Sequence, residues 1–215
     1  MTRVGLTQRV SVIEEYGERR DCLDQQWTEL LLEFGYTPIL LPNRIKQVEK
    51  YLDSLQLDAL VLTSGNDLAS LDEPSNPAPE RDRFERAVLE YAIENQIPLL
   101  GVCRGLEFLN VYFGGELTEV DNHVASTHSI EFGEDAQNLT LTKKATVNSY
   151  HDYGINLNDM GEDLTILGTA PDETVECVVH EDLPLWGIMW HPERESPSES
   201  VDRQIINHVL GEPEQ

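Results

Sequence analysis

The chain has 215 residues, and its 40 acidic against 15 basic side chains give a formal net charge of −25 at pH 7. Nucleic acid and anionic membranes are poor partners for so acidic a surface, and we expect neither. Without a long apolar run or a signal peptide, the sequence predicts a cytoplasmic protein. The acidic, lysine-poor composition fits a high-salt cytoplasm and an ordinary acidic protein equally well.

Short apolar runs alternate with amphipathic helical patterns in the first half of the chain. Strands are expected at 3–8, 38–41, 58–63 and 98–102, and helices at 21–34, 45–55, 80–96 and 104–113. This alternation is typical of βαβ units around a parallel sheet. We therefore predict an α/β, three-layer, flavodoxin-like fold with a mostly parallel central sheet and helices on both faces.

The pattern changes after Gly115. Strands are expected at 129–132, 139–142, 165–168, 174–179 and 185–190, before a last helix at 201–210. These strands should add an antiparallel part to the sheet. The proline-containing segment 66–79 is expected to be a loop, and is a candidate lid or substrate loop.

Three cysteines without C-x-x-C spacing predict neither a disulfide framework nor a zinc knuckle. Cys22 falls in a helical pattern and Cys177 in a strand pattern, and both are expected to be buried. Cys103 lies in GVCRG between a strand and a helix, which is the pattern of a nucleophile elbow. The helix N-terminus would favour its thiolate. The alternative is a buried cysteine in an ordinary turn.

A base for this thiol is expected at His191, in GIMWHPE, exposed just past an apolar strand. Glu193 would lie on the same side of an extended segment and orient the imidazole. Cys103, His191 and Glu193 would then be the nucleophile, base and acid of a catalytic triad. A plain surface turn is the alternative. No further metal-ligand spacing accompanies His191, so neither a metal nor another cofactor is expected. The oxyanion would be bound by the N–H groups of Gly65 and Arg104, unless TSGNDL is only a turn after a strand.

Together these motifs resemble the class I glutamine amidotransferase superfamily, and within it the γ-glutamyl hydrolase branch. The motifs that carry the resemblance, which spans nearly the whole chain, are GVCRG, WHPE, SGND, Arg81-Asp82, Thr127-His128-Ser129, VNSYHDYGI (147–155) and APDETVECV (170–178). The resemblance implies a single domain over 1–215. It also implies that Cys103 attacks a γ-glutamyl amide carbonyl to form a thioester, that His191 protonates the leaving amine, and that water then releases glutamate.

Several residues are candidates for substrate binding. Glu107 stands where related glutaminases usually carry glutamine, and its carboxylate would meet the α-ammonium group of the substrate or face solvent. Thr63 and Ser64 replace the paired glycines that relatives often show. The resemblance places the glutamyl pocket beside Ser149, Tyr150 and His151, and Asn66 and His128 are further candidates.

Four of the 15 basic residues are arginines within the first 20 positions. Arg9 and Arg19 are candidates for binding a phosphate or diphosphate, and ion pairing with Glu14, Glu15, Glu18 or Asp21 is the alternative. Thr7-Gln8-Arg9, Tyr16, Arg19-Arg20-Asp21 and Trp27 resemble a subgroup that hydrolyses γ-glutamyl-CDP-amidate.

The best substrate is therefore a small molecule, either a nucleotide-linked γ-glutamyl conjugate or a γ-glutamyl amine. Two other functions stay open. The chain could be the glutaminase subunit of a heteromer with a synthetase partner, or a non-catalytic binding module on the same fold. A homodimer is a further expectation.

Overall fold

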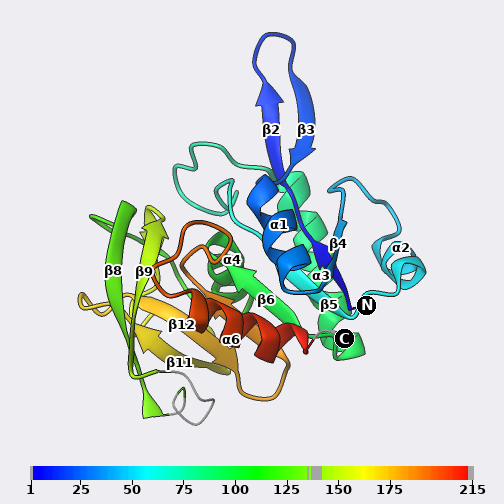
Figure 1. The fold of residues 1–215 in the computed structure, drawn as a ribbon. Coiled ribbons are helices and arrows are strands. Elements are labelled where there is room, and N and C mark those ends of the chain that lie inside the picture. Colours follow the sequence, from blue (N-terminus) through cyan, green and yellow to red (C-terminus); the bar gives the residue numbers. More distant parts are fainter. Residues whose placement is uncertain (1, 135, 137–141, 213–215) are drawn as a thin grey trace.

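The structure is a computed structural model that describes residues 2–134, 136 and 142–212. Its centre is a nine-stranded sheet (Figure 1). The strand order is β4 (Thr37–Leu40), β1 (Arg3–Leu6), β5 (Ala59–Leu62), β6 (Leu99–Val102), β13 (Leu185–Ile188), β12 (Val175–His180), β11 (Leu164–Thr169), β8 (Val124–Phe132) and β9 (Lys144–Tyr150).

The sheet has two halves with different pairing. Neighbours from β4 to β13 pair in parallel, whereas those from β13 to β9 pair antiparallel. The parallel strands are the short apolar runs of the sequence, and β5 and β6 are buried at every position. Strands of a parallel sheet are apolar at successive positions because the connecting helices pack on both faces of the sheet and bury them. The predicted fold class is confirmed.

Helices cover both faces of the parallel half. On one face, α1 (Gln25–Glu33) and α6 (Glu199–Leu210) bury Trp27 and Ile205 in a cluster that includes Val102 of β6. On the other face, α2 (Val48–Leu55), α3 (Pro79–Asn95) and α4 (Arg104–Tyr112) form a second cluster with Leu60 and Leu99. The three layers bring the carboxyl ends of β1, β5, β6 and β13 to one edge, where open α/β sheets bind ligands.

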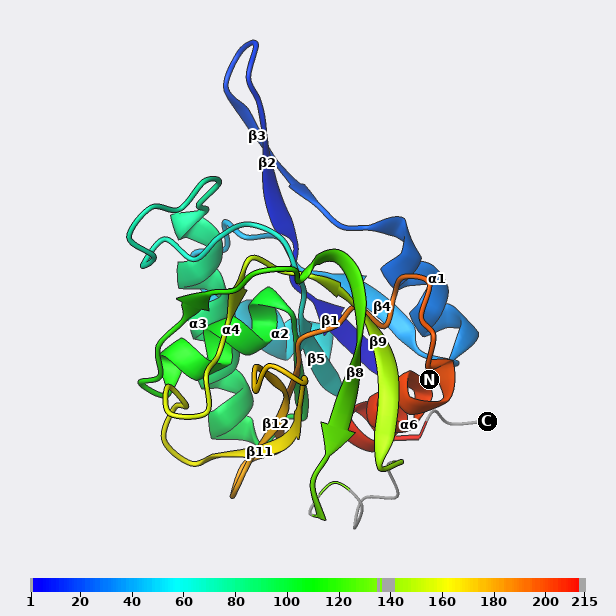
Figure 2. The ribbon, with the colours of Figure 1, turned by 90° about the vertical axis from the view of Figure 1, so that its left-hand side faces the viewer.

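A hairpin that the sequence analysis missed follows β1. β2 (Arg9–Ile13) and β3 (Glu18–Cys22) pair antiparallel and project from the body (Figures 1 and 2). The first helix therefore starts at Gln25 rather than at residue 21, and Asp24 caps it by accepting from the Gln26 N–H. Cys22 is only half-buried and lies at the end of β3, so both its predicted burial and its predicted place in a helix are wrong. Cys177 is buried in β12, as predicted.

Other differences lie in the second half. Strands β9, β7 (Thr118–Glu119) and β10 (Tyr153–Gly154) were not predicted, and the last two form a separate two-stranded sheet. The strand expected at 139–142 falls almost wholly outside the described residues. Segment 66–78 forms neither helix nor strand, as expected. Within the described ranges, no helix is long and apolar enough to cross a membrane.

Candidate active site

Cys103 lies directly after β6 at the ligand-binding edge of the sheet. Its φ of 52° and ψ of −108° place it in a region that residues with a side chain rarely adopt, and α4 begins at the next residue. The Cys103 N–H donates to the Ile188 carbonyl on neighbouring β13 at 2.8 Å, which fixes the turn against the sheet. A strained turn between strand and helix is the geometry of the predicted nucleophile elbow.

The two glycines of G-x-C-x-G make this turn possible by close backbone contact. A Cβ on Gly101 would lie 2.6 Å from the Gly105 carbonyl carbon and oxygen. A Cβ on Gly105 would lie 2.3 Å from the Leu62 carbonyl oxygen on β5. The start of α4 therefore rests on the backbones of β5 and β6, and each clash is with backbone atoms that cannot rotate away.

We expect Gly105→Ala to destabilise the fold by about 2–4 kcal/mol, because the methyl group forces α4 away from β5. Gly133→Ala is the matched control, since its Cβ would come no closer than 3.9 Å to the Leu167 carbonyl. Urea unfolding of the two variants measures the difference in the free energy of unfolding. Equal values would contradict the close-packed elbow.

The Cys103 thiol is buried, with 6% of the residue exposed. Burial raises its pKa well above the usual value, and the negative charges of Glu107 and Glu193 add to the effect. The backbone N–H of Arg104 acts in the opposite direction but is the weaker influence. Burial therefore opposes the thiolate that the helix N-terminus is expected to favour.

His191 follows β13, the strand next to β6, and its Nδ1 lies 2.8 Å from Glu193 Oε1. Both residues are buried, so the predicted exposure of His191 is wrong. The segment is a turn rather than extended, because the Arg194 N–H donates to the His191 carbonyl at 3.2 Å with Pro192 between them. His191 Nε2 is buried and has no hydrogen-bond partner in the described structure. That nitrogen is available to a substrate or a thiol.

Asn148 holds the backbone of His191, a role that was not predicted from the sequence. Its side-chain oxygen accepts from the His191 N–H and its amide donates to the His191 carbonyl, each at 2.8 Å. Asn148 lies on β9, the far edge strand, inside the VNSYHDYGI segment. On the same strand the ring of Tyr150 meets the His191 ring edge to face, with centroids 5.5 Å apart, and the Arg194 guanidinium covers the Tyr150 ring.

The turn after β5 carries Gly65, whose φ of 82° favours glycine. In the described part of the chain its N–H donates to no acceptor. Buried Arg81 fixes the turn from below by donating to the carbonyls of Thr63, Ser64 and Gly65. The Gly65 and Arg104 N–H groups therefore stand on adjacent strand ends, β5 and β6, where the sequence analysis expected an oxyanion site.

Glu107 is buried on the first turn of α4 and so does not face bulk solvent. Burial raises its pKa from 4.5 to about 7, and the nearby charges of Asp67 and Asp152 contribute, although Arg104 opposes them. A carboxylate in this position has much to gain from a cationic partner. This environment is consistent with the predicted contact to an α-ammonium group.

Because the pKa of Glu107 is raised on folding, its protonation stabilises the fold at acid pH, and this stabilisation is lost as the pH rises through about 7. The penalty at alkaline pH is on the order of 3 kcal/mol. We expect Glu107→Gln to be more stable than the parent protein at about pH 8.5, and the difference to shrink towards about pH 5. Thermal unfolding at both pH values measures this, with exposed Glu94→Gln as the control. A difference independent of pH would contradict it.

The β2–β3 hairpin joins the site through Asn66. The Asn66 side chain accepts from the Val10 N–H at 2.7 Å and donates to the Val10 carbonyl at 2.9 Å, so it is committed to the hairpin backbone. The Arg9 side chain lies over Gly65, where an added Cβ would be 2.9 Å from Arg9 Cδ. Arg19 pairs with Glu80 at 2.5 Å rather than with the acidic residues near it in sequence.

A pocket of about 610 Å³ opens between the hairpin and the loop that follows Gly65. Arg9 and Arg19 line it, together with Asn66, Ser75 and Asn76. Within the described ranges, Arg9 makes no ion pair. The pocket therefore offers one free and one paired guanidinium next to the expected oxyanion site.

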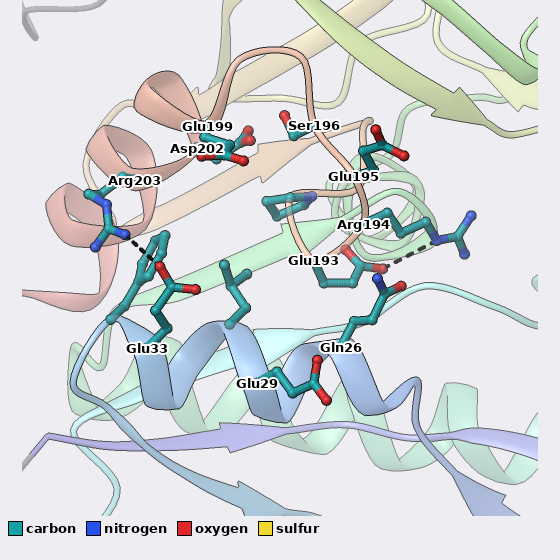
Figure 3. A pocket seen from close by; sticks show the side chains of 13 residues that line it. Gln26, Glu29, Glu33, Glu193, Arg194, Glu195, Ser196, Glu199, Asp202 and Arg203 are labelled. Atoms are coloured by element: carbon teal, nitrogen blue, oxygen red, sulfur yellow. Dashed lines mark hydrogen bonds and ion pairs between the residues drawn. The ribbon is translucent and has the colours of Figure 1, made fainter.

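A second pocket, of about 250 Å³, lies between α1, α6 and the loop after β13 (Figure 3). Glu193 faces it, and carboxylates dominate its wall: Glu29, Glu33, Glu193, Glu195, Glu199 and Asp202. Asp202 accepts from the Trp190 indole N–H at 2.7 Å, and Trp186, Met189 and Trp190 are buried, as predicted. An anionic ligand would be repelled here, so the hairpin pocket suits a phosphate better.

The remaining candidates, Ser149, His151 and His128, contact His123 and Glu176. The Ser149 hydroxyl donates to the His123 carbonyl at 2.6 Å, and His151 Nε2 lies 3.1 Å from His123 Nδ1. Burial lowers the pKa of His151 to about 4. His128 faces Glu176 at 3.2 Å. Ser149 and His151 thus point towards His123, whereas Tyr150 faces His191. Their contact with substrate stays a prediction.

Comparison with known proteins identifies the family. The peptidase C26 model matches residues 4–193. The γ-glutamyl-CDP-amidate hydrolase of Campylobacter jejuni is 35% identical over 197 residues, 90% of this chain and 90% of that protein. The γ-glutamyl-γ-aminobutyrate hydrolase of Escherichia coli O157:H7 is 28% identical and covers 90% of this chain and 87% of its own.

Solved structures agree on the fold. A glutamine amidotransferase of Thermotoga maritima covers 96% of this chain and 81% of its own, with a TM-score of 0.64 at 17% identity. A crystal structure from Thermoplasma acidophilum covers 98% of this chain and 93% of its own, with a TM-score of 0.72 at 21% identity. The chain therefore belongs to the peptidase C26 family of glutamine amidotransferase-like proteins.

Proposed function

We propose that this protein is a cysteine-dependent hydrolase of γ-glutamyl amide bonds that acts through a γ-glutamyl thioester. One observation carries the proposal. A strained elbow presents Cys103 directly after β6, and a buried His191–Glu193 pair with a free Nε2 follows the adjacent strand β13. Nucleophile, base and orienting acid in this relation are the parts of a catalytic triad.

The chemistry follows from the protonated resting thiol. His191 Nε2 takes the thiol proton as the sulfur attacks the γ-carbonyl carbon, and Glu193 stabilises the resulting imidazolium. The N–H groups of Gly65 and Arg104 receive the oxyanion. The imidazolium then gives its proton to the leaving nitrogen, and the thioester forms as the C–N bond breaks. Water, deprotonated by His191, hydrolyses the thioester to glutamate.

For the substrate we propose a nucleotide-linked γ-glutamyl conjugate such as γ-glutamyl-CDP-amidate. The C. jejuni relative with that name supports this choice, and so do Arg9 and Arg19 beside the hairpin pocket. Guanidinium groups suit phosphate oxygens because they donate two parallel hydrogen bonds. Arg19 would exchange Glu80 for the substrate, whereas Arg9 has no ion pair to give up in the described structure.

Glutamate release from a panel of γ-glutamyl compounds tests both the proposed reaction and the proposed substrate. The panel is glutamine, γ-glutamyl-γ-aminobutyrate, γ-glutamyl-putrescine, folyl-polyglutamate and γ-glutamyl-CDP-amidate. We expect release from the protein alone, fastest for the CDP-amidate. Turnover of glutamine only, and only after a synthetase is added, would instead establish a glutaminase subunit. No turnover of any member would favour a binding module.

Arg9→Ala separates the phosphate site from the γ-glutamyl site. We expect kcat/KM for the CDP-amidate to fall about 10–100-fold, the effect of losing a charge-assisted hydrogen bond. The value for a γ-glutamyl amine without phosphate should stay the same. Arg20→Ala, an exposed arginine paired with Glu18 on the same hairpin, is the control. Equal effects on the two substrates would contradict a phosphate role for Arg9.

A further inference from the structure

Three imidazoles surround a buried carboxylate in the antiparallel half of the sheet. Glu176 of β12 is fully buried, and in the described structure neither of its oxygens accepts a hydrogen bond. Around its Oε1 lie His128 Nε2 at 3.2 Å, His123 Nδ1 at 3.8 Å and His151 Nε2 at 3.8 Å. A buried carboxylate without hydrogen bonds is costly unless a cation balances it.

The outer partners of two of these histidines define which ring nitrogens carry protons. His151 Nδ1 lies 2.7 Å from the Tyr153 carbonyl oxygen, and His123 Nε2 lies 2.8 Å from Asp172 Oδ2. Both partners can only accept, so these ring nitrogens donate. The neutral rings then turn lone pairs towards each other at His123 Nδ1 and His151 Nε2, which are 3.1 Å apart. Only a shared proton or a cation makes this contact favourable.

We propose that His123, His128, His151 and Glu176 bind one divalent transition-metal ion, with Zn²⁺ as the best match. Ligands at the usual zinc distances define a tetrahedron with edges of about 3.3 Å. Four of the six edges measure 3.1, 3.2, 3.8 and 3.8 Å. The ligand atoms of His123, His128 and Glu176 all lie within 4.8 Å of one another, so a bound ion would draw this set together, with His151 as the fourth ligand. Three imidazole nitrogens and one carboxylate oxygen form a donor set that zinc accepts.

The outer partners match those of a metal site as well. Metal-bound histidines usually donate their second ring N–H to a carboxylate or a backbone carbonyl, as His123 and His151 do here. Four protein ligands leave no open position, which is typical of a structural site. The ion would join β8, β12 and the segment after β9, and would hold Tyr150 against His191. His151 would then be a metal ligand rather than a substrate-binding residue.

No motif predicts this site, because its ligands are spread from 123 to 176 without a recognisable spacing. Its ligands are not residues of the proposed triad, and it does not depend on the proposed hydrolase activity. The competing explanation uses no metal. His128 would be an imidazolium paired with Glu176, and a proton would be shared between His123 and His151.

Metal content and binding decide between the two explanations. The experiments use full-length Cys103→Ala protein, so that the buried thiol cannot act as a competing ligand. We expect about one equivalent of metal in the purified protein, measured by elemental mass spectrometry. After removal with a chelator, Zn²⁺ should bind with one-to-one stoichiometry by calorimetry and raise Tm. Co²⁺ should give the visible bands of a tetrahedral complex.

Variants show whether the ion binds at this cluster. Glu176→Gln should weaken Zn²⁺ binding at least about 100-fold, whereas Glu181→Gln, an exposed glutamate near the same strand, should not. If Glu176→Gln fails to fold, half-exposed Asp172→Asn replaces it, with an expected loss of about 10–100-fold. Protein without metal that binds neither Zn²⁺ nor Co²⁺ would overturn the proposal. Undiminished binding in Asp172→Asn and Glu176→Gln would overturn it as well.

Discussion

Cys103→Ala is expected to abolish glutamate release, with a loss in kcat of roughly 10⁵-fold or more. The alanine has no nucleophile to form the thioester, and no other thiol can replace it. Cys177 is fully buried in β12, and Cys22 lies on the hairpin. His191→Ala should cost nearly as much. Glu193→Gln should cost about 10⁴-fold, because the imidazole remains but loses its orienting charge.

Because Cys103, His191 and Glu193 act as a unit, the losses in kcat of the single variants should not add. The Cys103→Ala/His191→Ala double variant should be no slower than Cys103→Ala alone. Glu195→Gln is the control on the same loop, since its side chain is exposed. Steady-state glutamate release measures all of these variants. Independent, additive losses would contradict a triad.

Labelling provides a test that does not depend on the correct substrate. A γ-glutamyl-mimicking electrophile should modify Cys103 in a Cys22→Ser background, and the label should be absent after Cys103→Ala. Because the resting thiol is protonated, His191→Ala should slow the labelling. Labelling that is unchanged by His191→Ala would show that this imidazole does not activate the thiol.

Cys103 could be predicted from the sequence because its evidence is local. The apolar strand, the two glycines and the helix that follows are contiguous, and their backbone contacts depend on residues within five positions and on the two neighbouring strands, β5 and β13. The acid partner of His191 was predicted for a similar reason, since Glu193 is two residues away. Even there the sequence predicted an extended segment, because it does not reveal the hydrogen bond across Pro192.

The features that sequence reasoning missed depend on distant residues. The backbone of His191 is held by Asn148 from β9, an edge strand of the sheet. Burial by the surrounding fold is the main cause of the raised pKa of Cys103, and carboxylates from α4 and from the turn after β13 add to it. The hairpin was missed, and its last two residues were assigned to the first helix, because β3 is polar on both faces and shows no strand alternation.

Arg81→Met is expected to destabilise the protein by about 3–5 kcal/mol, the largest stability effect we predict for a single side chain. Arg81 and Glu85 are both fully buried on α3, with Nε and Oε1 2.8 Å apart. The other Glu85 oxygen binds Arg104, which also binds Asp82. Burial alone would raise the pKa of Glu85, but the charges of Arg104 and Arg81 hold it below its usual value. Removing one cation leaves a buried charge poorly compensated.

The same arginine also supports the proposed oxyanion site. Its guanidinium is the donor shared by the three carbonyls of 63–65, so methionine would release the turn that aims the Gly65 N–H. Arg81→Lys keeps the charge, but one ammonium group cannot reach Glu85 and three carbonyls together. We therefore expect both variants to lower kcat more than they change KM.

Denaturant unfolding and steady-state kinetics, measured on the same preparations, separate the two roles. Arg20→Met removes an exposed arginine–glutamate pair and should cost less than about 1 kcal/mol. Arg81→Lys should recover part of the lost stability while kcat stays low, because the charge is restored but the turn is not. Arg81→Met with a free energy of unfolding near that of Arg20→Met would mean that the ion pair is not what fixes α3 beneath the site. Full recovery of kcat in Arg81→Lys would mean that charge alone, and not the three carbonyl contacts, positions the turn that carries Gly65.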